Sequence, residues 1–206
     1  DPSPGGSLYV PVKIAPAATQ TVQLRLAWYV PKSDLSAMRY GETCASAGTH
    51  TPWYARRFAS IGDVSRYWAA HYDDLRAESA AFADSFYDTT LPPEAVEAVA
   101  ANLTILKSPT VLRQHDGRVW AWEGCCDASG CCAGSCTHVW NYAQALPHLF
   151  PSLERTLRET EFGENQDERG HQDFRAALPI QPTAHKFHAA ADGQLGGIMK
   201  AYREWR

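Results

Sequence analysis

Apolar residues beyond residue 60 recur at intervals of three and four positions, which places them on one face of an α-helix. The segment 63–86 begins at Asp63, a residue type that caps helix N-termini, and carries Val64, Tyr67 and Leu75 in its apolar stripe. The same periodicity recurs in four further segments, 90–108, 137–146, 152–161 and 192–206. We therefore expect a mainly α fold.

Three of these predicted helices carry stripes that indicate which face is buried. The helix that opens with Pro92 and Pro93 is expected to bury Val96, Val99, Ala100, Leu103 and Leu106. The helix from about residue 137, which Pro147 should end, is expected to bury Val139, Tyr142, Ala143 and Leu146. The final helix presents Leu195, Ile198, Met199, Tyr202 and Trp205. A face this apolar requires a packing partner, which we expect to lie beyond residue 206.

Apolar and polar residues alternate in two segments near the N-terminus, 8–15 and 22–28, and alternation is typical of strands. We expect these strands to pair around residues 16–18 and to belong to a larger sheet, since a lone hairpin is marginal in water. The polar stretch that follows indicates a linker. The predicted parts are therefore 1–32, strands; 33–55, linker; and 56–206, a helical domain.

Charge and hydropathy exclude two classes of partner. The net charge is −4 and no Lys/Arg run exceeds a pair such as Arg56-Arg57, so the chain lacks the basic patch that nucleic acid requires. No apolar run approaches the roughly 20 residues that cross a bilayer. The first residues, 1–6, resemble neither a signal peptide nor an initiator segment. The chain is thus expected to be a fragment, and its compartment is not indicated.

Five of the six cysteines crowd between Cys125 and Cys136, close to His138. Zinc sites usually pair their ligands as Cys-x2–4-Cys with a second pair well downstream, whereas vicinal cysteines such as Cys131-Cys132 point apart. Buried unpaired thiols are therefore the expectation, with a local disulfide or a structural Cys/His metal module as alternatives. No metal and no cofactor is predicted.

A short hairpin is predicted from strands at 110–113 and 118–122, which place Glu123 where strand becomes loop. Glycoside hydrolysis needs an ionised carboxylate beside the anomeric carbon and aromatic faces for the sugar. Trp120, Trp122 and Glu123 offer both. The alternative is that the two tryptophans are core residues on one strand face and Glu123 only caps a turn.

Polar residues on the helix after this loop form a second candidate group. Thr137, His138 and Asn141 could line a cleft and hydrogen-bond sugar hydroxyls, because residues three apart share a helix face. The simpler reading is a solvated face. A Cys136/His138 nucleophile pair is disfavoured, since no orienting third residue is evident. Asp192, at the start of the last helix, could be a ligand residue or only an N-cap.

These segments together resemble glycoside hydrolase family 116, which includes the non-lysosomal glucosylceramidase. The matching pieces, in family order, are 53–58, 91–93, 101–103, 107–109, 122–124, 136–142, 149–154 and 199–205. The resemblance implies the last strands of a β-sandwich followed by the opening helices of an (α/α)6 barrel. It implies a retaining β-glycosidase acting on a carbohydrate or glycolipid, completed by the remainder of its own catalytic domain.

The resemblance also assigns roles to residues. Glu123 matches the family's nucleophile, and the acid/base aspartate would lie beyond Arg206. Trp122, Thr137, His138, Asn141 and Asp192 are then expected to bind substrate, with His138 standing where mammalian-type members have a sugar-binding aspartate. A non-catalytic carbohydrate-binding helical domain is the alternative.

Overall fold

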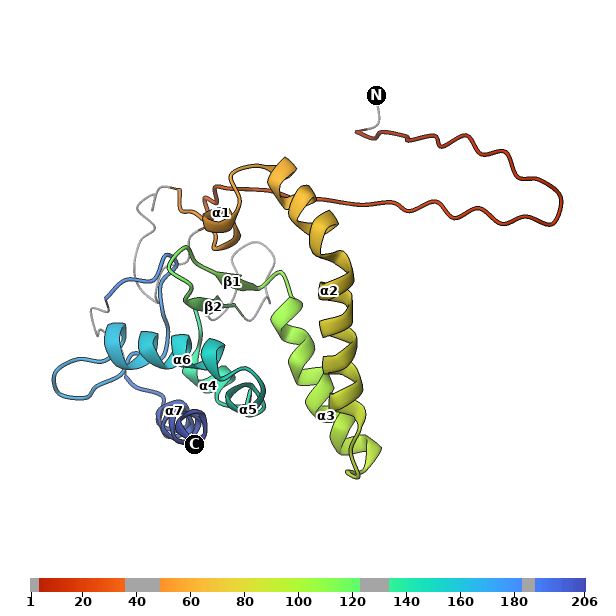
Figure 1. Cartoon of the computed structure of the whole chain (residues 1–206). Coiled ribbons are helices and arrows are strands. Elements are labelled where there is room, and N and C mark those ends of the chain that lie inside the picture. The colour runs from red at the N-terminus through yellow and green to blue at the C-terminus, as the bar shows by residue number, and fades with distance from the viewer. Residues whose placement is uncertain (1–3, 36–48, 123–133, 183–187) are drawn as a thin grey trace.

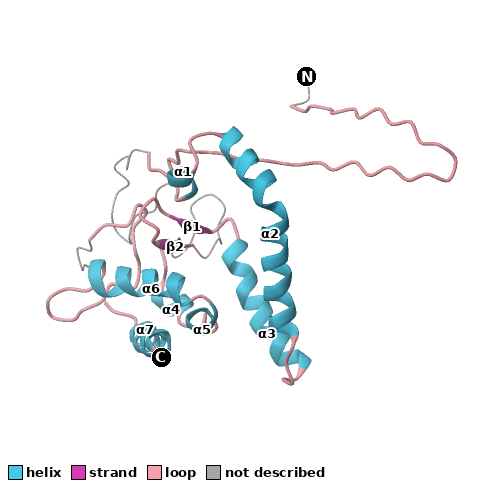
Figure 2. Ribbon diagram, viewed as in Figure 1, coloured by secondary structure: helices cyan, strands magenta, loops and turns pink. Residues whose placement is uncertain are grey.

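A computed structural model describes residues 4–35, 49–122, 134–182 and 188–206. About half of the chain is helical, and a small two-stranded sheet lies among the helices (Figure 2), so the prediction of a mainly α fold is confirmed. The elements are α1 Tyr54–Arg57, α2 Ile61–Tyr87, α3 Pro93–Thr104, the 3-10 turn η1 Ile105–Lys107, β1 Val111–Arg113, β2 Val119–Ala121, α4 Thr137–Trp140, α5 Leu146–Leu149, α6 Pro151–Glu159, the π-helical turn η2 Thr160–Glu164 and α7 Ala191–Trp205.

The predicted short hairpin is confirmed. β1 and β2 pair antiparallel, with Leu112 opposite Trp120. Gly117 turns the chain between them at φ +98°, a conformation that side chains with a Cβ rarely adopt. All three residues of β2 are buried, so this short strand lies in the core of the molecule.

The two faces of β2 contribute to two separate cores. Val119 and Ala121 pack with Trp140, Leu146 and Leu157 from α4, α5 and α6. On the opposite face, Trp120 packs with three residues of the segment that follows η2, namely Ala176, Leu178 and Ile180. Successive strand residues point to opposite faces, which is why a strand of three residues can join both clusters.

α2 and α3 form an antiparallel helical hairpin that extends away from these cores (Figure 1). α2 starts two residues before the prediction, and its N-cap is Ser60 rather than Asp63. Ser60 Oγ accepts from the Asp63 amide (3.1 Å) and donates to Asp63 Oδ2 (2.8 Å), a reciprocal capping arrangement that explains why the acid is inside the first turn. No residue of α2 is fully buried.

The predicted stripe of α3 faces inward, because all five of its residues are half-buried while their neighbours are mostly exposed. The stripe predicted for the helix from 137 was wrong for Val139 and Tyr142, whereas Leu146 is buried and Ala143 packs against the core as predicted. α4 ends at Trp140 and α5 begins at Leu146, so the continuous helix is interrupted and Val139 and Tyr142 are exposed. Pro147 lies in the first turn of α5, where its missing amide costs no hydrogen bond, instead of ending a helix.

The apolar face predicted for α7 is uncovered in the described chain, since Leu195 is 63% exposed and Trp205 is 77% exposed. The opposite side is buried instead, with Gly193, Gly196, Gly197 and Lys200 packed on α4 and α6. Glycines have no Cβ and so let two helices approach closely. The glycine face of α7 is therefore the face that packs against α4 and α6.

Residues 8–30 differ from the prediction of paired strands. They run out and back as two extended arms joined at a turn, in which the Ala18 amide donates to the Ala15 carbonyl (3.0 Å) (Figure 1). No strand is assigned within residues 4–32, and large apolar side chains such as Leu24 and Leu26 are over 80% exposed. Extended chain needs neighbouring strands to satisfy its amides, and the described residues supply none. Among the described helices, none combines the length and the apolar content that a bilayer-spanning segment requires.

Candidate functional site

Four of the predicted substrate-binding residues meet along one seam between α4 and α7. Thr137, His138 and Asn141 come from α4 and its C-terminal cap, and Asp192 comes from the first turn of α7. The seam is tight because glycines face it. A Cβ on Gly193 would lie 2.4 Å from Thr137 Oγ1, and one on Gly196 would lie 1.4 Å from Asn141 Oδ1.

His138 and Asp192 form a hydrogen-bonded pair across this seam, through His138 Nδ1 and Asp192 Oδ2. The hydrogen bond from His138 holds the pKa of Asp192 below its usual range. Because the carboxylate only accepts, Nδ1 carries a proton, and Nε2 is left as the ring nitrogen for other partners. Both side chains are about half exposed, so this nitrogen is available to a solute.

Tyr142 and Thr137 frame the pair. The Tyr142 ring meets His138 edge-on, with centroids 6.0 Å apart, and is itself 66% exposed. Thr137 is 2% exposed, and its hydroxyl has no hydrogen-bond partner among the described residues. The backbone of Thr137 is fixed by its amide, which donates to the Phe174 carbonyl (2.9 Å).

Trp122 directly follows β2 and lies beside Trp120, with ring centroids 6.4 Å apart. Both belong to the core cluster on that face, so the reading of these tryptophans as core residues holds for Trp120, whereas Trp122 is only partly buried. Glu123 lies outside the described residues, as do Cys44, Cys125, Cys126, Asp127, Cys131 and Cys132.

Hydrogen bonds fix the backbone on either side of segment 123–133. The Ser135 amide donates to the Ala121 carbonyl (2.6 Å), and Ser135 Oγ accepts from the Ala121 amide (3.1 Å). Gly134, at φ +68°, sits so close to Ala176 that a Cβ would lie 1.5 Å from its carbonyl oxygen. Both ends of the segment that contains Glu123 are therefore anchored at the end of β2, close in sequence to Thr137.

A buried ionic cluster, which the sequence analysis did not predict, packs next to the seam and joins α7 to α6 and α4. Arg158 pairs with Glu154 (Nε–Oε1, 2.8 Å) and with Glu161 (Nη1–Oε2, 2.5 Å), and Lys200 of α7 reaches Glu154 Oε2 at 3.2 Å. Lys200 also donates to the Trp140 carbonyl (3.0 Å). Each residue is at most 6% exposed. The i−4 and i+3 spacing around Arg158 was a visible signal for the pairs, but not for their burial.

Burial perturbs the ionisation of this cluster. It raises the pKa of Glu161 to about 7, although Arg158 and Lys200 oppose the shift, and it raises the pKa of Glu154. Burial likewise lowers the pKa of Lys200, with Arg158 adding to the effect. The cluster joins α6 to α7 through Lys200 and so fixes the helix that carries Asp192.

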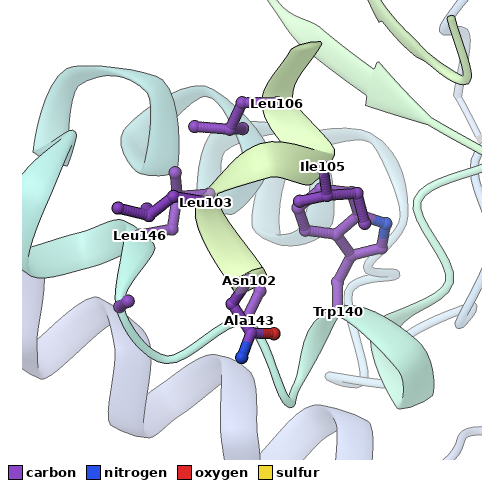
Figure 3. A pocket seen from close by; sticks show the side chains of 8 residues that line it. Asn102, Leu103, Ile105, Leu106, Trp140, Ala143 and Leu146 are labelled. Atoms are coloured by element: carbon purple, nitrogen blue, oxygen red, sulfur yellow. The ribbon is translucent and has the colours of Figure 1, made fainter. Parts of the chain in front are cut away.

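Several cavities and clefts lie away from the seam between α4 and α7. A cavity of about 10 Å³ between α3, η1 and α4–α5 is lined mostly by apolar residues and has room for about one water (Figure 3). Wider clefts lie at the tip of the α2–α3 hairpin, beside the C-terminal end of α7, and along β1. At the seam, the side chains of His138 and Asp192 are each about half exposed.

In the part of the chain that the structure describes, no three His, Cys, Asp or Glu side chains converge as a metal site would require, and Cys136 is buried outside any disulfide. Comparisons with protein-family models, with curated proteins and with solved structures found no match to the chain.

Proposed function

We propose that this chain is part of a retaining β-glycosidase of the glucosylceramidase type, with Glu123 as the nucleophile. In this proposal residues 56–206 open an (α/α)6 barrel, residues 1–32 are strands of a β-sandwich, and the acid/base aspartate follows residue 206. The substrate is a carbohydrate or glycolipid.

The observation that carries the proposal is the meeting of His138 and Asp192, which are 54 positions apart in sequence, on a seam that also holds Thr137 and Asn141. Sugars are recognised through hydroxyl groups that both donate and accept, and the half-exposed imidazole of His138 with the Asn141 amide beside it suits them. Segment 123–133, which contains Glu123, is followed by Gly134, which lies three residues before Thr137.

The chemistry assigns each group a task. Glu123 attacks the anomeric carbon while the downstream aspartate protonates the leaving oxygen, and the same aspartate then activates the water that releases the sugar. Retention requires the two carboxyl groups to be about 5–5.5 Å apart. His138 and Asn141 orient the sugar, and Asp192 fixes the tautomer of His138. Lys200 holds α7 against α6 through Glu154 and against α4 through the Trp140 carbonyl.

The proposal is tested with a mechanism-based 2-fluoroglycoside on a protein that carries this chain together with its downstream barrel. We expect one covalent label on Glu123, found by peptide mass mapping, and its loss in Glu123→Gln. The matched control is Glu159→Gln, an exposed acid on α6 that should leave labelling intact. A label on another residue would refute the nucleophile assignment. Turnover that survives Glu123→Gln would indicate that Glu123 only binds sugar.

A further inference from the structure

A cleft of about 430 Å³ lies at the tip of the α2–α3 hairpin, at the end remote from α1 (Figure 1). Its walls come from the last residue of α2, from the connection that follows and from α3, and the apolar ones are Tyr87, Leu91, Pro93, Val96 and Ala100. The volume falls within the range of roughly 300–1,000 Å³ that ligand pockets occupy. The cleft shares no residue with the seam between α4 and α7, so its assignment does not depend on the proposed glycosidase activity.

The apolar walls of this cleft are open to solvent. Tyr87 is 63% exposed and Leu91 is 61% exposed, while Val96 and Ala100 are half-buried. Val96 and Ala100 belong to the apolar stripe of α3, so the cleft continues a helix face that is already apolar. Contiguous apolar side chains in contact with water mark a surface that another body covers.

Aromatic contacts fix the position of the wall that Tyr87 forms. The Tyr87 ring meets Phe86 edge-on, with centroids 5.1 Å apart, and Phe86 stacks on Phe82 at 6.1 Å. Phe82 in turn lies 5.7 Å from the ring of Phe150, which stands between α5 and α6. The end of α2 is thereby linked to the other helices, so a ligand meets a preformed wall and orders few side chains on binding.

Negative charge is concentrated around the same cleft. Residues 77–106 contain five acidic residues and no Lys, Arg or His, so this segment carries more negative charge than the whole chain, whose net charge is −4. The acids are Glu78, Asp84, Asp88, Glu94 and Glu97. All five are exposed, and none forms an ion pair with another described residue. Glu97 is itself a wall of the cleft.

Asp84 and Asp88 lie at the end of α2 where a helix disfavours negative charge. The last carbonyl groups of a helix carry partial negative charge, which basic residues normally offset. α2 has no basic residue in its last turn, and Asp88 is its C-cap. These two acids therefore destabilise the helix end in the chain alone, and a cation bound there would offset the repulsion. Glu94, in the first turn of α3, is favourably placed by the same rule.

The acids form a pair on each helix, because Asp84 and Asp88 are four positions apart and Glu94 and Glu97 are three apart. One small amine can offset one such pair, whereas a peptide with several basic side chains can reach both. The apolar walls at the same time accept an aliphatic side chain. A nucleic acid or an anionic lipid surface would be repelled. The charge and the cleft together therefore favour a basic peptide with an apolar anchor.

We propose that the tip of the α2–α3 hairpin binds a basic, amphipathic peptide segment of a partner protein. An aliphatic side chain of the partner packs against Tyr87, Leu91 and Val96, and its Lys or Arg side chains pair with the acids of both helices.

The test is calorimetric titration of the intact chain with a capped synthetic peptide in which two leucines are flanked on each side by two lysines. The matched probes replace the leucines by alanine or the lysines by glutamate. We expect saturable binding that weakens as the salt concentration rises, at least tenfold weaker binding of the alanine peptide, and no binding of the glutamate peptide. No saturable binding of the leucine–lysine peptide would overturn the proposal. Equal binding of the alanine peptide would overturn it too, because charge alone would then account for the interaction.

Two variants assign the contacts. Asp88→Asn combined with Glu97→Gln should weaken the peptide roughly fivefold and reduce the salt dependence. Leu91→Gln should weaken it roughly tenfold and leave the alanine peptide unchanged, and because Leu91 is exposed, its replacement should not impair folding. Unchanged binding in Leu91→Gln would refute the role of the cleft.

The matched control lies on the same helix, outside the acidic segment. Asp73→Asn combined with Asp74→Asn removes the same amount of charge about 20 Å from Tyr87 along α2 and should leave binding unchanged. A loss equal to that of the Asp88/Glu97 variant would show that the peptide follows the charge of the whole helix, which would overturn the assignment to the tip.

The same titration on a protein that carries this chain together with its downstream barrel distinguishes a separate partner from the rest of the chain. We expect binding to be retained. Its loss would show that later helices of the same chain cover the tip, and the proposal of a partner protein would be wrong.

Discussion

At the scale of single residues, the buried charges of α6 and η2 are the feature with the clearest consequence. Glu161 has a folded-state pKa of about 7, raised by burial from 4.5, so between these values the folded chain holds a proton that the unfolded chain has released. Stability must therefore fall as pH rises through this window. Glu154, whose pKa is also raised, contributes with the same sign.

We predict that the free energy of unfolding decreases from about pH 4.5 to about pH 7, with at most about 3 kcal/mol due to Glu161. Glu161→Gln should flatten this dependence, which denaturant titrations at several pH values would measure. Glu159→Gln, an exposed position at the end of the adjoining α6, should retain the wild-type slope. An unchanged slope in Glu161→Gln would contradict the assignment of the titrating group.

Gly196 gives a second prediction at this scale, because a Cβ there would lie 1.4 Å from Asn141 Oδ1 and 3.0 Å from its Cβ. Gly196→Ala should displace α7 from α4 and lower stability by roughly 1–3 kcal/mol, despite the better helix propensity of alanine. Gly163→Ala is the control, since nothing lies within 4 Å of the added methyl group. Thermal melts of both variants would measure the difference. Equal melting temperatures would show that α7 and α4 accommodate the added methyl group without loss of stability.

The sequence could supply the identity of the seam residues but not their contacts. Thr137, His138 and Asn141 were singled out by helical spacing, and Asp192 by its place at a helix start. Their meeting depends on glycines of α7 packing against α4, and spacing within one helix carries no information about a partner 54 residues away. The ionic cluster was missed for a related reason, because charged residues at i−4 and i+3 normally indicate a solvated face.

At the scale of elements, the start of α2 shows how local chemistry fixes a boundary. Ser60 and Asp63 satisfy each other in the first turn, so the cap is local and independent of tertiary packing. Ser60→Ala should lower stability by about 1 kcal/mol and fray the first turn, measurable by thermal melts and by amide exchange. Ser65→Ala, exposed on the same helix, should have little effect. A cost at Ser65 matching that at Ser60 would show that the cap has no special role.

Apolar periodicity predicted the inward face of α3 correctly, since Leu103 lines a cavity with Leu106 of η1 and Trp140 of α4 (Figure 3). α7 instead buries its glycines and Lys200 against α4 and α6. Apolar periodicity identifies a face that needs cover, whereas glycine spacing identifies where another backbone approaches, and α7 has both on opposite sides.

At the scale of the whole molecule, large apolar side chains remain exposed on three separate parts, the extended arms of 8–30, the α2 helix and the outer face of α7. Scattered exposed apolar residues are ordinary, but contiguous ones mark surfaces that another body covers. This agrees with the proposal that the chain functions within a larger barrel and sandwich.

The outer face of α7 permits a direct test. Leu195→Gln with Ile198→Gln should reduce binding of a hydrophobic dye and self-association in sedimentation, with little change in stability, because these side chains are 63% and 54% exposed. Leu157→Ala, at 2% exposure in the core, is the contrast and should cost about 2–5 kcal/mol. Destabilisation of the double variant to the same extent as Leu157→Ala would show that this face is already packed within the chain. It would then need no partner from outside the chain.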